Sequence, residues 1–489
     1  MDVLHPPLRR SLARAALALL LALAPALAAQ QAPVPLPRVA IDPTTGVPGV
    51  TPAQIDPGYW IARLPDPDRE WLDRAGVAAQ NARMRALDPY ILDLRALPAP
   101  LPRQRVLDAI QALSVLPVHP LYDPAGQPVP AAQLAAWQDA LALDAIPPTQ
   151  PLRYGLVVHR AALRTFPTAA RVFSRPGDND IDRLQESALF PGDAVAVLHA
   201  SRDGRWLFVA SERYQAWIEA AFVATGSAEE VFGYAAQGPY RVVTGATAFT
   251  AYTPEEPRVS RLQLDMGVRV PVVTDWPPAR PLNGQLPYTG WVVRLPVRND
   301  DGSLGFAAAL LPRTADTSAD YLPLTPRNLL AQAFKFLGER YGWGHEYDNR
   351  DCSGFVSEIY RSLGVLVPRN TSAQAVSPAL ARIGPGKDAD RTARLKLVAG
   401  LQVGDLVYIP GHVMVVIGHD RGLTYIIHDT AGGGWAGPDG RRMAGGLNGV
   451  AVTPLEAMLA SDDRGFVDLI TSIQRVPADP PPLPTSGSR

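Results

Sequence analysis

The sequence predicts an α+β domain at the C-terminus, preceded by two small all-β barrels and an N-terminal helical region. The spacing of apolar residues changes along the chain, from three or four residues near the N-terminus to two in the middle. Fifty prolines and 40 glycines imply many turns and short strands, and 47% apolar with 19% charged residues is typical of globular cores. A length of 489 residues predicts several domains.

The first 28 residues have the three parts of a secretory signal peptide. Three arginines precede a short apolar run at 15–23, and Ala-Leu-Ala at 26–28 is a cleavage signal. The run is too short for a comfortable membrane span, so we expect no stable membrane anchor. We therefore expect an exported protein of the periplasm or cell envelope. The pair Arg9-Arg10 leaves the twin-arginine route open as an alternative.

Two Pro-rich stretches flank the expected domains, a linker at 29–57 and a tail at 477–489. Between 58 and 150, apolar residues recur at spacings of three and four, as Val106, Ile110 and Leu113 do. This periodicity predicts an N-terminal helical region.

Short alternating apolar runs then follow in two groups. The first group, at 151–232, has runs at 155–158, 194–198, 206–209 and 215–218, and the second, at 233–318, has them at 240–243, 268–273, 290–294 and 305–308. Short strands at such spacing predict small barrels. Both units resemble the bacterial Src-homology-3-like barrels that accompany cell-wall enzymes, and a generic all-β spacer is the alternative.

The expected C-terminal domain, at 319–476, opens with a helix. Thr325 can cap free N–H groups and Pro326 suits the first helical position. A second helix is predicted from Asp351-Cys352 to Leu363, because apolar residues recur on one face at 355, 356, 359, 360 and 363.

Cys352 is the only cysteine of the chain, so it cannot form an internal disulfide. An unpaired cysteine in an exported protein points to a reactive thiol, although a small buried structural residue is the alternative. The free N–H groups and dipole at the start of a helix stabilise an anion. We therefore expect the pKa of Cys352 to be lowered.

Three histidines lie downstream of the thiol, at 412, 419 and 428. The segments 412–418 and 424–428 predict an antiparallel hairpin. With the turn centred near Asp420, His412 faces His428 directly, where paired β-carbons are about 5 Å apart. His419 then lies at the tip, roughly 23 Å from His412 along the strand. The hairpin thus selects His412 and His428 as partners.

The motifs around these residues resemble the NlpC family of bacterial cell-wall cysteine peptidases. They are Tyr-Gly-Trp-Gly from Tyr341, Asp-Cys-Ser-Gly from Asp351, the stretch 366–374, Gly-Asp-Leu-Val-Tyr at 404–408, and Gly-His-Val from Gly411. The form with two preceding barrels is the most similar. These motifs cover about a fifth of the chain, and the layout alone supports the rest.

The resemblance implies a papain-like fold and hydrolysis of peptidoglycan stem peptides or muropeptides, at the bond between γ-D-glutamate and the diamino acid. It makes Cys352 the nucleophile, His412 the general base and His428 the residue that orients its ring. Residues implied to contact the substrate are Tyr341 beside the oxyanion, Asp351, Ser353, Thr371 and Ser372. Structural roles are the alternative for four of these: a helix cap at Asp351, core packing at Tyr341, and loop hydroxyls bonded to the backbone at Thr371 and Ser372.

His345 departs from the pattern, since many relatives have glycine or alanine there. We expect it near the cleft, where it either tunes substrate choice or faces solvent, and not as a catalytic group. A net charge of −1 provides no excess of positive charge that would bind the phosphates of a nucleic acid, so no nucleic-acid partner is expected. The chain lacks HExxH and clustered Cys or His ligands, so no metal or cofactor is predicted and a metal-dependent hydrolase is a weak competitor. A non-catalytic wall-binding scaffold is the other alternative.

Overall fold

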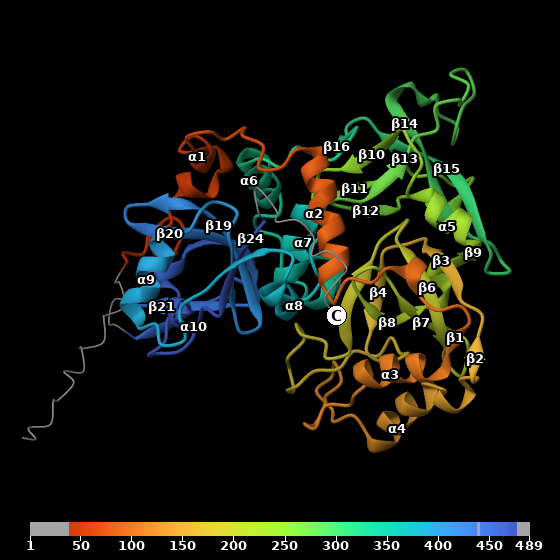
Figure 1. Cartoon of the computed structure of the whole chain (residues 1–489), viewed down its shortest axis with the longest axis horizontal. Helices are drawn as coiled ribbons and strands as arrows, with labels where there is room; N and C mark the ends of the chain where they lie inside the picture. The colour runs from red at the N-terminus through yellow and green to blue at the C-terminus, as the bar shows by residue number, and fades with distance from the viewer. Residues whose placement is uncertain (1–38, 438–440, 477–489) are drawn as a thin grey trace, which may run out of the picture. The chain divides into compact units, whose positions relative to one another are not determined.

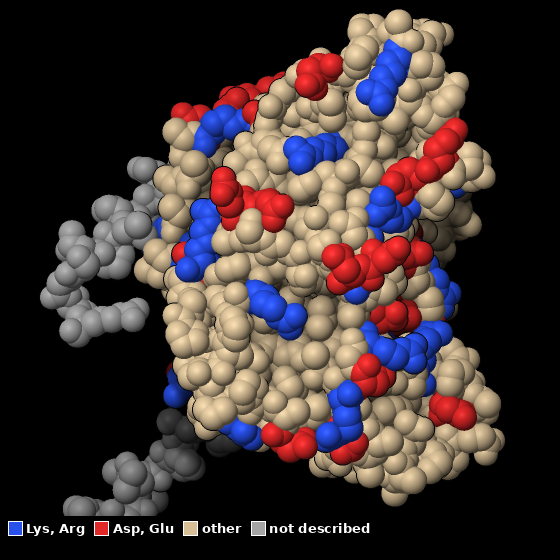
Figure 2. Space-filling view, turned by 90° about the vertical axis from the view of Figure 1, so that its right-hand side faces the viewer, with Lys and Arg blue, Asp and Glu red and all other residues tan. Residues whose placement is uncertain are grey.

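The computed structural model describes residues 39–437 and 441–476. The expected signal peptide, the first part of the expected linker and the C-terminal tail lie outside the described residues. Within the described ranges, no helix combines the length and the apolar character that a bilayer crossing requires. Figure 2 shows acidic and basic side chains interspersed on one face of the molecule, in keeping with a net charge of −1.

Residues 39–57 are folded rather than extended as a linker. Val50 is buried in the same core as Tyr425 of the C-terminal domain. Gln54 Nε2 and Tyr59 Oη both donate to Asp420, at 2.8 and 2.9 Å. Pro48, Val50 and Gln54 are the buried residues of this segment, and its Pro-rich composition alone does not reveal that they are held on the C-terminal domain.

The helical region follows, and its helices are α1 (Pro57–Ile61), α2 (Arg74–Leu87), α3 (Arg103–Leu113) and α4 (Ala131–Ala140). A short pair of strands, β1 (Leu101–Pro102) and β2 (Thr149–Gln150), closes it. Val106 and Ile110 are buried on α3, as their spacing predicts. Their core also holds Phe208 and Trp217 of the next unit, so the helices pack on its strands.

The first strand-rich unit is an antiparallel sheet in the order β5-β4-β8-β7-β6-β3-β9. Its strands are β3 (Arg153–Val157), β4 (Ala161–Arg164), β5 (Gln185–Leu189), β6 (Ala194–Ala200), β7 (Trp206–Ala210), β8 (Gln215–Glu219) and β9 (Val223–Gly226). The four predicted strands are confirmed as β3, β6, β7 and β8. The sequence did not reveal β4, β5 and β9, because their sequences carry little alternation of apolar and polar residues.

The second unit follows helix α5 (Ala228–Tyr234) and consists of three small sheets, β13-β10-β16, β11-β12 and β14-β15. The strands are β10 (Tyr240–Val243), β11 (Thr247–Phe249), β12 (Gln263–Asp265), β13 (Arg269–Pro271), β14 (Gly290–Arg298), β15 (Leu304–Pro312) and β16 (Thr317–Ser318). Its core, with Val270, Leu295 and Leu311, is distinct from that of the first unit.

The C-terminal domain is built on a sheet in the order β17-β24-β18-β19-β20-β23. Its helices are α6 (Pro326–Phe334), α7 (Cys352–Ser362), α8 (Thr371–Val376), α9 (Arg391–Ala399) and α10 (Phe466–Leu469). Its strands are β17 (Ala381–Ile383), β18 (Leu406–Ile409), β19 (His412–Asp420), β20 (Leu423–Thr430), β21 (Gly433–Ala436), β22 (Arg442–Gly445), β23 (Gly449–Pro454) and β24 (Ser472–Arg475).

Helix α7 packs its apolar face against β19 and β20 (Figure 1). Phe355, Val356 and Ile359 share one core with Val415 and Ile427 of those strands. Both predicted helix starts are confirmed, because Thr325 accepts from Asn328 N and Asp351 from Gly354 N as N-caps. This packing sets the N-terminal end of α7 beside the start of β19.

Candidate active site

Cys352 is the first residue of α7 and is 4% exposed. Its Sγ lies 3.6 Å from Thr371 Oγ1 and 4.0 Å from the carbonyl oxygen of Gly411, the residue before β19. The thiol therefore lies where α7, α8 and β19 begin, and its neighbours there include Thr371, the carbonyl of Gly411 and the backbone N–H of Val413.

The structure brings His412 and His428 together at the start of β19 and the end of β20. His412 Nε2 is 2.8 Å from His428 Nδ1, and His428 Nε2 is 3.1 Å from Thr453 Oγ1 on β23. His428 is fully buried. Because Nε2 of His412 faces His428, Nδ1 is the ring nitrogen of His412 that this chain of contacts does not use. Thr453 was not singled out in the sequence, because it meets His428 only through the pairing of β20 with β23.

The predicted register of the hairpin is wrong by two residues. Val415 faces Ile427, so His412 and His428 are diagonal neighbours rather than directly opposite. A shift of two keeps both side chains on one face, and diagonal pairs are within reach of aromatic rings. The cause lies at the tip, where a bulge separates Val416 from Gly418 and a turn at Arg421-Gly422, both with positive φ, closes the hairpin.

His419 lies near the tip of the hairpin, as predicted. Its Nε2 is 2.7 Å from the carbonyl oxygen of Leu401, and its Nδ1 is 3.3 Å from Thr424 Oγ1. Both ring nitrogens therefore have partners away from the thiol.

The thiol is not the stabilised anion that its place at a helix start predicts. Burial, with the nearby Asp351 carboxylate, raises the pKa of Cys352 to about 12. Burial also lowers the pKa of His412 to about 4. At neutral pH the pair is therefore a neutral thiol and a neutral imidazole, because desolvation outweighs the helix-end effect.

Asp351 and Ser353 are bonded to Arg369, a residue of the motif 366–374. Arg369 Nη2 is 2.9 Å from Asp351 Oδ2, and its Nη1 is 2.9 Å from Ser353 Oγ. Its Nε donates to Ser187 Oγ of the first strand-rich unit at 2.7 Å. All three side chains are at least nine-tenths buried, so Asp351 acts as a helix cap and as the partner of a cation. Arg369 was not singled out as a site residue, because its partners are distant in the sequence.

The other three expected contact residues differ in their surroundings. Tyr341 is 6% exposed and lies near Cys352 and Asp351, which together with burial raise the pKa of its hydroxyl. Thr371 begins α8 and touches the thiol, whereas Ser372 is exposed.

His345 is 3% exposed, so its side chain does not face solvent. Its Nδ1 is 2.8 Å from Arg369 Nη2 and its Nε2 is 3.0 Å from Glu358 Oε1. Burial, with the nearby Arg369 cation, holds the pKa of His345 well below its usual value. The neutral ring therefore accepts from Arg369 and donates to Glu358.

Glu358 continues this network into the second strand-rich unit. Arg350, which is 1% exposed, donates from Nε to Glu358 Oε2 at 3.0 Å and from Nη1 to Glu339 Oε1 at 3.1 Å. Its Nη2 is 3.3 Å from Asp265 Oδ2 on β12. Arg160 of the first unit also donates to Asp265, at 2.8 Å. Asp265 thus joins both strand-rich units to Arg350, which lies two positions before Cys352.

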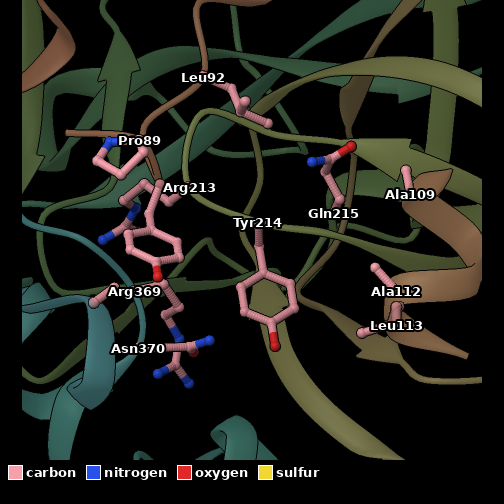
Figure 3. A pocket seen from close by; sticks show the side chains of 12 residues that line it. Pro89, Leu92, Ala109, Ala112, Leu113, Arg213, Tyr214, Gln215, Arg369 and Asn370 are labelled. Atoms are coloured by element: carbon pink, nitrogen blue, oxygen red, sulfur yellow. The ribbon is translucent and has the colours of Figure 1, made fainter. Parts of the chain in front are cut away.

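Tyr214 of the first strand-rich unit lies near Arg369. The hydroxyl of Tyr214 donates to Glu186, and Thr165 Oγ1 donates to the other oxygen of that carboxylate at 2.7 Å. Tyr214 also lines a pocket together with Arg369 and Asn370 (Figure 3). In the described part of the chain, no three His, Cys, Asp or Glu side chains are grouped as ligands for a metal ion.

Asp429, next to His428, is a fully buried carboxyl group whose two oxygens have no hydrogen-bond partner among the described residues. Burial, with the nearby Asp351 and Glu339, raises its pKa to about 9. The folded chain therefore keeps a proton that the unfolded chain loses above about pH 4, so this group lowers stability as the pH rises from 4 to 9.

We expect Asp429→Asn to raise the free energy of unfolding by about 2 kcal/mol or more at pH 8, and by much less at pH 5. Urea unfolding at both pH values measures this difference. Asp405→Asn is the matched control, since Asp405 is also buried but is held by Arg475 at 2.6 Å. That control is expected to lose stability. A loss of the same size at Asp429 would contradict the assignment of a protonated carboxyl.

Comparisons with known proteins agree with this geometry. Residues 338–433 match the model of the NlpC/P60 family, and residues 171–219 match that of the SH3 domain of the SH3b1 type. A solved structure described as a novel NlpC/P60 endopeptidase from Photobacterium damselae subsp. piscicida has a similar fold, with a TM-score of 0.69 and 16% identity over 87% of this chain and 98% of that one.

A curated relative, the probable endopeptidase p60 of Listeria welshimeri, is 30% identical over 120 residues. That match spans 22% of this chain and 20% of the relative's length. The region matched by the NlpC/P60 model includes α7 with the thiol and the hairpin of β19 and β20. The region matched by the SH3 model includes β5 to β8 of the first strand-rich unit. The C-terminal domain of this chain therefore belongs to the NlpC/P60 family, and an SH3 domain of the SH3b1 type precedes it.

Proposed function

We propose that this protein is an exported cysteine endopeptidase that hydrolyses peptidoglycan stem peptides. The bond that it hydrolyses is the one between γ-D-glutamate and the diamino acid. The observation that carries the proposal is the contact of Cys352 Sγ with the carbonyl oxygen of Gly411 at 4.0 Å, because the next residue, His412, begins the chain of contacts through His428 to Thr453. The match to the NlpC/P60 family supports the reaction class.

The reaction begins with a neutral pair. His412 Nδ1 takes the proton from Cys352 as Sγ attacks the carbonyl carbon, because neither group is charged beforehand. The acyl-enzyme forms when His412 gives this proton to the departing amine. Water then attacks the thioester carbon while His412 accepts a proton from it, the C–S bond breaks to release the carboxyl product, and His412 returns the proton to Sγ to restore the thiol. His428 holds the ring of His412 through Nε2, and Thr453 holds His428.

Mass spectrometry of the products tests the proposed bond. Purified muropeptides of defined stem composition are incubated with the full chain, with and without a chelator. We expect fragments that end at glutamate and fragments that begin with a free diamino acid. The yield of these fragments is expected to be the same with and without the chelator. Fragments from another bond would refute the assigned specificity, and loss of activity with the chelator would favour a metal-dependent hydrolase.

The neutral pair predicts the pH dependence of the reaction. With the pKa of His412 near 4, kcat/KM is expected to rise through about pH 4 and then to stay level across neutral pH. Since Cys352 is the only cysteine, its alkylation by iodoacetamide reports the thiolate directly. Alkylation is expected to be slow at pH 7 and still accelerating at pH 10. A rate that reaches its plateau below pH 7 would instead indicate a preformed ion pair.

The orienting role of His428 predicts a contrast between two alanine variants. His428→Ala is expected to lower kcat by roughly 10²-fold, because His412 then loses the contact that fixes its ring and tautomer. His419→Ala is the matched control on the same hairpin, and it is expected to retain most of the activity. A greater loss in His419→Ala, measured on the same muropeptide, would contradict the assigned pair.

A further inference from the structure

A pocket of about 270 Å³ lies between helix α3, the turn that joins β7 to β8, and the start of α8. One of its walls is apolar, with Ala109, Ala112 and Leu113 of α3. The other carries Arg213, Arg369 and Asn370, as Figure 3 shows. A cavity with an apolar wall and a few polar groups is typical of a ligand site.

Arg213 is a cation of this pocket that has no ion-pair partner among the described residues. It is partly buried, and within the described residues it forms no hydrogen bond or ion pair. The two carboxylates whose charges act on Arg213 are paired with other arginines, Asp193 with Arg361 at 2.7 Å and Glu212 with Arg85 at 2.7 Å. Burial, with the nearby Arg361, lowers the pKa of Arg213 to about 10, which still leaves it protonated at neutral pH.

The pocket borders the candidate active site. Arg369 and Asn370 line it, and the next residue, Thr371, contacts the thiol. The guanidinium of Arg369 is already bonded to Asp351, Ser353, Ser187 and His345. Arg369 is therefore satisfied by the protein, whereas Arg213 can accept a new anionic partner.

We propose that Arg213 binds a carboxylate of the peptide substrate in this pocket. This inference rests on the proposed function, in which the γ-linkage leaves the α-carboxylate of glutamate free near the cleaved bond. A guanidinium pairs with a carboxylate through two parallel hydrogen bonds. The alanines and leucine of α3 then contact the aliphatic part of the same peptide. Arg213 is thus a specificity-determining residue supplied by the SH3 domain.

Calorimetric titration of the full chain carrying Cys352→Ala tests the proposal without hydrolysis. The probes are a γ-D-glutamyl tripeptide as the free acid, the same peptide with a carboxamide at the glutamate, and a third with a carboxamide at the diamino acid. We expect one of the two carboxamides to bind about tenfold more weakly than the free acid, since a hydrogen bond to a charged group is lost. Adding Arg213→Gln is expected to remove that difference.

Arg205→Gln is the matched control, because Arg205 is an exposed arginine of the same unit outside the pocket. It is expected to leave the discrimination unchanged. Discrimination that persists in Arg213→Gln, or that is absent from the parent protein, would overturn the proposal. The binding test and the test of the proposed function can fail independently. If the wild-type chain does not cleave the free acid, the peptidase assignment is refuted, but the binding result is unaffected.

Discussion

Replacement of Cys352 by alanine is expected to lower the release of stem-peptide fragments by roughly 10³-fold or more. The thiol is the only one in the chain, so no second sulfur can replace it as nucleophile. The measurement is the rate of fragment release from purified muropeptides, followed by mass spectrometry.

The same substitution is expected to leave the fold intact. Alanine removes one atom from a small side chain at the surface of the core, so thermal unfolding should shift little. Normal digestion by a folded Cys352→Ala variant would contradict the peptidase assignment. It would favour the alternative of a wall-binding scaffold.

Asp265→Ala is expected to destabilise the chain by about 3–5 kcal/mol, because it leaves Arg350 without one of its buried carboxylate partners. Asp265 is fully buried, accepts a hydrogen bond from Arg160 and forms an ion pair with Arg350. Its loss therefore affects the strand-rich units and the residues before Cys352 together. Chemical denaturation at neutral pH measures the change in the free energy of unfolding.

Asp68→Ala is the control for this effect, since Asp68 also pairs with an arginine, Arg327, but on the surface. Exposed pairs contribute little, so its stability should stay close to that of the parent. Equal losses of unfolding free energy in the two variants would show that the buried ion pairs of Asp265 contribute no more to stability than a surface pair.

Local rules predict the elements of the active site well. The start of α7 follows from Asp351 as a cap and from the apolar residues at 355, 356 and 359, and the helix begins at the expected residue. Thr325 and Pro326 define α6 in the same way. Capping and helical periodicity depend on neighbours within about four residues, so one sequence contains all the information needed.

Such local rules do not predict the register of the hairpin formed by β19 and β20. The alternation of β19 and β20 places the two histidines on one face, but the bulge after Val416 and the turn at Arg421-Gly422 set the register. One inserted residue and a change of turn centre moved the pairing by two positions. Sequence pattern fixes the face of a strand more firmly than its register.

The pKa of Cys352 and the role of Arg369 depend on the assembled fold. The dipole at the start of a helix is visible from the sequence, whereas the burial that outweighs it is not. Arg369 lies 18 positions from Asp351 and 182 from Ser187, and they meet only when the SH3 domain and the peptidase domain pack together. Contacts of this kind have no local signature.

The segment before α2 has a consequence for the order in which the protein folds. Gln54 bonds to Asp420, a residue 366 positions later, and Tyr425 donates to the backbone of Gly49 across 376 positions. These contacts close only after nearly the whole chain has been synthesised, because their second partners emerge last from the ribosome. Loop closure over such distances is slow. The N-terminal segment at 49–59 therefore docks on the C-terminal domain as a late step of folding.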